Sequence, residues 1–112
     1  MKIAVNTRLL LKDKMDGIGL FTYESFKKMV VAHPEIEFIF IFDRTPDPTF
    51  IFAKNITAKV ISPQARHPWL YMVWYQISLK RLLNKLKPDL FIATDGMIPL
   101  NCKTNTLAVI HD

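Results

Sequence analysis

The sequence contains a single cysteine, Cys102, among its 112 residues. One cysteine excludes an internal disulfide framework and a four-cysteine zinc site, and it is typical of a reducing compartment. The N-terminal apolar run is interrupted by Asn6 and Arg8, too early for a secretory signal. The longest apolar stretch, 69–75, is well short of the roughly 20 residues that span a bilayer. We therefore expect a cytoplasmic protein with no transmembrane helix.

Half of the residues are hydrophobic and 22% are charged, a balance that predicts one folded domain rather than a disordered chain. Fifteen Lys and Arg residues outnumber ten Asp and Glu residues, which gives a formal net charge of +5. This excess permits attraction to phosphate-bearing partners. The basic residues are scattered except for Lys80, Arg81, Lys85 and Lys87, so the composition does not predict a nucleic-acid surface.

Apolar patterning predicts strands and helices that alternate along the chain. Helical spacing predicts one helix between Gly19 and Pro34 and another between Pro68 and Pro88, since proline ends or begins a helix. Strands are expected at 2–8, 37–43, 56–62, 90–93 and 106–110. This order predicts an α/β, Rossmann-like fold, with an open, mostly parallel five-stranded sheet in the order 3-2-1-4-5 and helices on both faces.

Ligands of such sheets bind beyond the carboxyl ends of the strands, where the strand order reverses. Gly17 and Gly19, directly before the first helix, could present backbone N–H groups to an anion at the positive helix end. The alternative is a glycine-containing turn that only connects the loop to the helix and binds no anion. Asp95 follows the fourth strand in an Asp-Gly pair that is also a turn signal.

His111 ends the last predicted strand, where a histidine can exchange a proton or bind a sugar hydroxyl. The alternative is a surface histidine near a terminus. His33 and His67 offer no metal-ligand spacing with it, so we predict no metal site. A dinucleotide fingerprint is disfavoured because Thr22 stands in place of its third glycine, although Asp43 ends a strand where a ribose-binding carboxylate would lie.

The second predicted helix opens with residues 69–75, which are apolar all round. This exceeds what one buried stripe needs, so we expect a domain or subunit contact in addition to core packing. A ligand platform or a membrane-surface patch is the alternative, in which the nearby basic residues would meet anionic lipid headgroups.

Several short motifs together resemble glycosyltransferase family four, the retaining enzymes of GT-B fold. The start of the chain, 1–10, carries the resemblance together with Asp-Gly-Ile-Gly at 16–19 and Phe-Thr-Tyr-Glu at 21–24. The later landmarks follow the family's order and are His67-Pro68, Trp74, Leu79, Pro88-Asp89-Leu90-Phe91, Asp95-Gly96 and Val109-Ile110-His111-Asp112.

The resemblance implies a metal-independent transfer of a sugar from a nucleotide-sugar donor to a glycan, lipid or polysaccharide-precursor acceptor, with no further cofactor. This chain would be the N-terminal, acceptor-side domain, and a C-terminal domain outside it would hold most of the donor. By the same resemblance, Gly17 and Gly19 approach the donor phosphates, His111 lines the active centre and Asp95 faces the acceptor. Leu20 departs from the family, whose members often carry arginine there.

We also expect the fold to be truncated after its fifth strand, which no helix follows, and the isolated chain to be inactive and prone to dimerise through exposed apolar surface. Two other functions remain open. One is a stand-alone nucleotide- or phosphate-binding module, and the other is a structural interaction domain that uses the helix 69–87.

Overall fold

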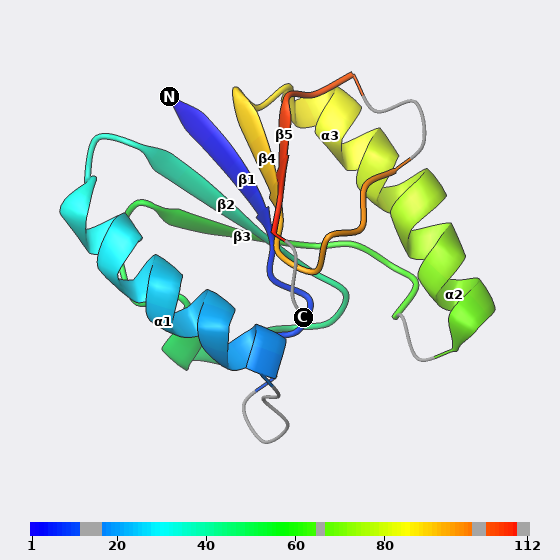
Figure 1. Cartoon of the computed structure of the whole chain (residues 1–112), viewed down its shortest axis with the longest axis horizontal. Helices are drawn as coiled ribbons and strands as arrows, with labels where there is room; N and C mark the ends of the chain where they lie inside the picture. Colours follow the sequence, from blue (N-terminus) through cyan, green and yellow to red (C-terminus); the bar gives the residue numbers. More distant parts are fainter. Residues whose placement is uncertain (12–16, 65–66, 100–102, 110–112) are drawn as a thin grey trace.

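A computed structural model describes residues 1–11, 17–64, 67–99 and 103–109. The described residues form a five-stranded sheet in the order β3-β2-β1-β4-β5, and every neighbouring pair is parallel (Figure 1). The predicted Rossmann-like α/β fold is therefore confirmed. The strands are β1 (Lys2–Asn6), β2 (Glu37–Phe42), β3 (Ile56–Val60), β4 (Leu90–Ala93) and β5 (Thr106–Ala108).

The first helix, α1 (Gly17–Ala32), begins two residues earlier than predicted and ends before Pro34, as expected. The second predicted helix is continuous but not uniform. It consists of α2 (Pro68–Val73), a π-helical stretch η2 (Trp74–Leu79) and α3 (Lys80–Leu86). A short 3-10 turn, η1 (Pro48–Phe50), lies in the β2–β3 connection.

The sheet is covered on both faces, because successive side chains of a strand point to opposite sides. Figure 1 shows α1 on one face and the helix formed by α2, η2 and α3 on the other. The core under α1 includes Ile3, Val5, Phe26, Val30, Phe38, Phe40, Phe42, Phe50 and Ile92. The core under the second helix includes Ala4, Ile39, Ile41, Trp74, Tyr75, Leu79, Leu83, Phe91 and Ala93.

β2 is enclosed on both faces, as its unbroken apolar run predicts. β3 and β5 are the edge strands, and Val60 and Leu107 on them are half exposed. On α1 the buried residues are Gly19, Thr22, Phe26 and Val30, whereas Met29 is 39% exposed. Within the described residues, no helix has both the length and the apolar character needed to cross a bilayer.

The packing of the second helix can be tested with two aliphatic side chains of that helix. Leu83 is buried against the sheet, whereas Ile77 is 52% exposed. Leu83→Ala is expected to lower the free energy of unfolding by about 2–5 kcal/mol, because it leaves a cavity in the core. Ile77→Ala is expected to change it by less than about 0.5 kcal/mol. Urea unfolding of both variants measures this, and equal losses would contradict the burial of the helix.

Candidate functional site

The strand order reverses between β1 and β4. The chain leaves β1 toward β2 on one side and leaves β4 toward β5 on the other. Val5 pairs with Ile92, so the two strands end at the same level of the sheet. Because the connections diverge here, this point of the carboxyl edge is where a ligand of such a sheet is expected.

Five polar or aromatic side chains meet at this reversal, and we call them the switch-point cluster. Asn6 and Arg8 come from the end of β1, Asp95 follows β4, and Tyr71 and Tyr75 come from the second helix. The hydrogen bonds between their side chains join residues that are 20 to 89 positions apart in sequence. The fold therefore assembles the cluster from three separate segments.

The carboxylate of Asp95 is the centre of the cluster. Its Oδ2 accepts hydrogen bonds from the Tyr75 hydroxyl and from Arg8 Nη2, the latter at 3.3 Å. Asn6 Nδ2 lies 3.5 Å from both carboxylate oxygens, and the Met97 N–H donates to Oδ1 at 3.1 Å. The Asp95 side chain is 7% exposed, so protein donors satisfy a charge that burial would otherwise make costly.

Local backbone geometry holds Asp95 in place. Gly96 has a φ of +80°, and its N–H donates to Ala93 O at 3.0 Å. The Val109 N–H donates to the same Ala93 oxygen, also at 3.0 Å, which joins the end of β5 to this turn. The predicted Asp-Gly turn is therefore present, and its glycine is required by a left-handed conformation.

The π-helical stretch η2 presents two adjacent aromatic residues to different partners. Trp74 Nε1 donates to Ile61 O at 3.0 Å, beyond the end of β3. Tyr75, the next residue, donates to Asp95 at the switch point. Both side chains are buried, and single π turns inside helices often occur at functional sites.

Arg8 lies between the cluster's two tyrosines and its carboxylate. Its Cζ is 4.6 Å from the centre of the Tyr71 ring and 5.9 Å from that of Tyr75, which are cation–π distances. Burial works against the charge, but interactions with Tyr75, Tyr71 and Asp95 raise the pKa of Arg8 above its ordinary value. The guanidinium therefore stays charged, and its side chain is 12% exposed.

Tyr75 remains a hydrogen-bond donor across the physiological range. Burial, and then the charge of Asp95 together with their hydrogen bond, raise the pKa of the Tyr75 hydroxyl far above its ordinary value. Burial likewise raises the pKa of Tyr71. The cluster thus holds one positive and one negative side chain together with two neutral phenols.

The predicted site residues have different places in the structure. Gly17 is the exposed first residue of α1, at the edge where the strands end (Figure 1), whereas Gly19 is buried two residues later. A Cβ added at Gly17 would meet nothing within 4 Å. Asp95 belongs to the switch-point cluster. His111 lies outside the described residues, so its predicted place at this edge stays a prediction.

Sequence reasoning missed four members of the cluster, namely Asn6, Arg8, Tyr71 and Tyr75. Asn6 and Arg8 follow a strand just as Asp95 does, so the rule that selected Asp95 could have selected them. The tyrosines were interpreted only as parts of an apolar helix. Their hydroxyl groups were the signal, because a buried tyrosine usually has a hydrogen-bond partner.

The other predicted acidic residue, Asp43, is already engaged. Its buried carboxylate accepts two hydrogen bonds from the neighbouring Arg44, from Nε at 2.9 Å and from Nη2 at 3.1 Å. A ribose would have to compete with this bidentate pair. Among the described residues, no group of three His, Cys, Asp or Glu side chains is arranged to hold a metal ion.

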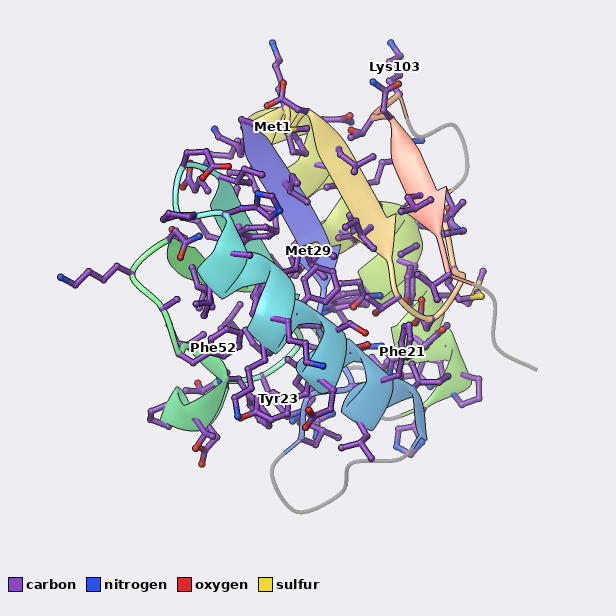
Figure 2. All side chains as sticks on the ribbon, turned by 60° about the vertical axis from the view of Figure 1, so that its left-hand side comes forward. Met1, Phe21, Tyr23, Met29, Phe52 and Lys103 are labelled. Atoms are coloured by element: carbon purple, nitrogen blue, oxygen red, sulfur yellow. The ribbon has the colours of Figure 1, made fainter. Side chains whose placement is uncertain are left out.

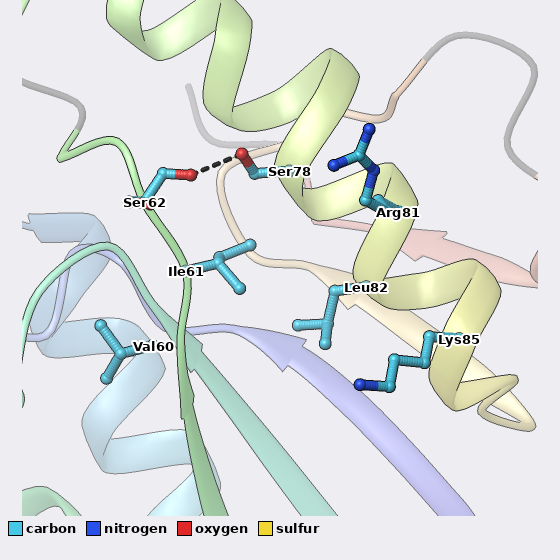
Figure 3. Close-up of a pocket in the computed structure, with 7 residues that line it drawn as sticks. All are labelled: Val60, Ile61, Ser62, Ser78, Arg81, Leu82 and Lys85. Atoms are coloured by element: carbon cyan, nitrogen blue, oxygen red, sulfur yellow. Dashed lines mark hydrogen bonds between the residues drawn. The ribbon is translucent and has the colours of Figure 1, made fainter.

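Two surface hollows lie away from the cluster. One, with a volume of about 340 Å³, separates the end of β3 from the second helix and is closed at one end by the Ser78 hydroxyl, which donates to Ser62 O (Figure 3). Arg81 and Lys85 line it. Lys87 instead lines a hollow of about 370 Å³ that also contains residues preceding β4 and β5. Arg81 and Lys85 of the predicted basic cluster thus line a different hollow from Lys87.

Comparisons of this chain with protein-family models, with curated proteins and with solved structures gave no significant match.

The Asp-Gly turn can be tested with a matched pair of glycine variants. A Cβ at Gly96 would lie 3.2 Å from Val109 O, at a φ that side chains disfavour. Gly96→Ala is therefore expected to lower the free energy of unfolding by at least about 1–2 kcal/mol. Gly17→Ala, at an open position, is expected to leave it unchanged or slightly raised. Thermal unfolding measures both, and a tolerated Gly96→Ala would contradict the turn.

The hydrogen bond from Tyr75 to Asp95 gives a second prediction. Tyr75→Phe leaves a buried carboxylate with one donor fewer, and we expect a loss of about 1–3 kcal/mol in the free energy of unfolding. Tyr23→Phe is the control. Its ring makes edge contacts with Phe50 and Phe52, at 5.6 Å and 6.1 Å between ring centres, and phenylalanine keeps them (Figure 2).

The raised pKa of Tyr75 adds a pH signature. Above pH 10, the ordinary pKa of tyrosine, the unfolded chain loses the phenolic proton while the folded chain keeps it. Stability is therefore expected to fall with rising pH by up to about 1.4 kcal/mol per pH unit from this group. Tyr75→Phe should flatten that slope and Tyr23→Phe should not, as measured by denaturant unfolding at several alkaline pH values.

Proposed function

We propose that the chain is the N-terminal, acceptor-side domain of a glycosyltransferase that moves a sugar from a nucleotide-sugar donor to a glycan, lipid or polysaccharide-precursor acceptor. One observation carries the proposal. Arg8 and Asp95 meet at the β1/β4 reversal of a 3-2-1-4-5 sheet, at the edge where α1 begins with Gly17. The motif resemblance to retaining GT-B enzymes supports the same function.

In this proposal, the carboxyl edge supplies polar groups for a sugar and positive groups for phosphate. The start of α1 stabilises negative charge because unpaired N–H groups gather at a helix N-terminus. Gly17 has no side chain to obstruct that approach, and Gly19 follows it two residues later. Asp95 contributes to the acceptor side, and His111 exchanges a proton or binds a sugar hydroxyl in the active centre.

No metal is required by this scheme, because fixed positive groups can offset developing phosphate charge. A second, C-terminal domain would hold most of the donor. We place the enzyme in the cytoplasm, with the inner face of the membrane as the site of any lipid-linked acceptor.

The second helix favours an additional contact. Its N-terminal half exposes Trp69 (67%), Met72 and Ile77, and Arg81 and Lys85 follow along the same helix. Exposed aromatic and apolar side chains beside basic ones fit a membrane surface or a protein partner. This supports a peripheral membrane contact, or a dimer, as the accessory function of the helix.

The proposal is tested by assaying the product of the complete reading frame against a panel of nucleotide sugars, with release of the nucleoside diphosphate as the readout. His111→Ala is expected to lower turnover by about 100-fold or more, the usual contribution of a proton-transferring side chain. His33→Ala is the matched control, because His33 is an exposed histidine just beyond α1 whose ring contacts Glu35.

Both variants are expected to have the same unfolding temperature as the wild-type protein. Equal turnover in the two variants would remove His111 from the mechanism. Failure to consume any donor, with lipid and glycan acceptors supplied, would overturn the glycosyltransferase proposal. Saturable nucleotide binding without transfer would then favour a nucleotide-binding module.

A further inference from the structure

Arg8 has donor capacity that its protein partners do not use. A guanidinium carries five N–H groups in a planar fork that suits bidentate recognition of carboxylate or phosphate. Asp95 takes only one contact from it, at 3.3 Å from Nη2, and Tyr75 and Tyr71 also interact with the guanidinium. Arg8 Nε is nevertheless buried with no hydrogen-bond partner in the described part of the chain. A buried pair built only for stability would be expected to use the fork more fully.

The reason lies in the other partners of Asp95. Tyr75, Asn6 and the Met97 N–H all donate to the same carboxylate. These donors occupy most of its acceptor positions, of which a carboxylate has about four. Asp95 is therefore held by its neighbours and in turn fixes one corner of the Arg8 guanidinium.

The plane of the guanidinium is fixed separately. The Tyr71 ring lies against it, with 4.6 Å between Arg8 Cζ and the ring centre. The backbone at Arg8 is held as well, because its N–H donates to Asn6 Oδ1 at 3.1 Å. An arginine held in this way loses little rotamer freedom when a ligand binds, which favours a precise anion contact. Because Nε is enclosed, a ligand would meet the terminal Nη groups.

We propose that Arg8 is a phosphate-binding residue at the β1/β4 reversal and that Asp95, Tyr71 and Tyr75 act as its positioning residues. The inference rests on the proposed function for its ligand, a phosphate group of the donor or of a lipid-linked acceptor. It extends that function to a residue two positions beyond β1, on the same sheet edge as the start of α1.

The test uses the wild-type chain, labelled with nitrogen-15 in its arginine side chains, and inorganic pyrophosphate as the probe. Because Arg8 Nε is buried, its N–H should exchange slowly with water and give its own NMR signal. We expect that signal to shift saturably with pyrophosphate up to about 10 mM, well above a millimolar Kd. Arg81, which is exposed and lines the hollow shown in Figure 3, is the internal control, and its signal should shift little.

A variant pair strengthens the test. Arg8→Lys keeps the positive charge but loses the planar fork of donors. We therefore expect the affinity for pyrophosphate to fall about tenfold, or about 1.4 kcal/mol. A backbone amide signal at the same sheet edge reports this binding. Arg81→Lys should leave it unchanged. Repeating the titration with a nucleoside diphosphate and with a short-chain phosphatidic acid distinguishes a donor phosphate from a lipid phosphate.

The outcomes separate this inference from the proposed function. An Arg8 signal that stays fixed with all three probes overturns the inference even if the complete protein transfers sugar. A saturable shift that Arg8→Lys weakens supports it even if no sugar transfer is found. An equal response of Arg8 and Arg81 would indicate unspecific attraction to positive charge and would also overturn it.

Discussion

The position of β1 is the constraint on which the rest of the structure depends. This strand pairs in parallel with β2 on one side and with β4 on the other, so its side chains are buried on both faces. The connections that leave β1 and β4 then diverge toward opposite sides of the sheet. Polar residues from separate segments meet there, at the ligand-binding edge of the sheet and directly beyond an enclosed part of the core.

Charge at such a place is stable only if the surrounding fold supplies partners. Asp95 receives donors from β1, from its own turn and from the second helix. Removing one partner from a buried ion pair usually costs far more than the pair contributes. The cluster is therefore better understood as a device that fixes geometry than as a source of net stability. Arg8 gains from it a defined orientation.

Much of the fold could be predicted because it depends on local patterns. The run from Phe38 to Phe42 is apolar without alternation, and it forms an interior strand buried on both faces. Pro34 and Pro88 ended the helices where expected. The start of α1 was placed two residues late, at Gly19, because Gly17 was interpreted as a loop residue, whereas the helix includes it.

The site was less predictable because its contacts are non-local. Arg8 and Asp95 are 87 residues apart, and Tyr75 and Asn6 are 69 apart, so no motif spacing connects them. The π-helical stretch has no apolar period of its own and was invisible in the sequence. An apolar pattern marks which residues are buried, but it does not show that Tyr71 and Tyr75 carry their hydroxyl groups to a buried charge.

Two adjacent residues of the π-helical stretch bind the chain at two separate places beyond the strands. Trp74 is hydrogen-bonded to the chain just beyond β3, beside the hollow that Arg81 and Lys85 line. Tyr75 is hydrogen-bonded to Asp95 at the β1/β4 reversal. These two neighbouring residues therefore hold the helix to the chain beyond β3 and to the chain beyond β4, the strands that flank β2 and β1. A displacement of the helix along its axis would strain both hydrogen bonds together. The hollow beside β3 and the switch-point cluster are therefore both in contact with the same helical turn.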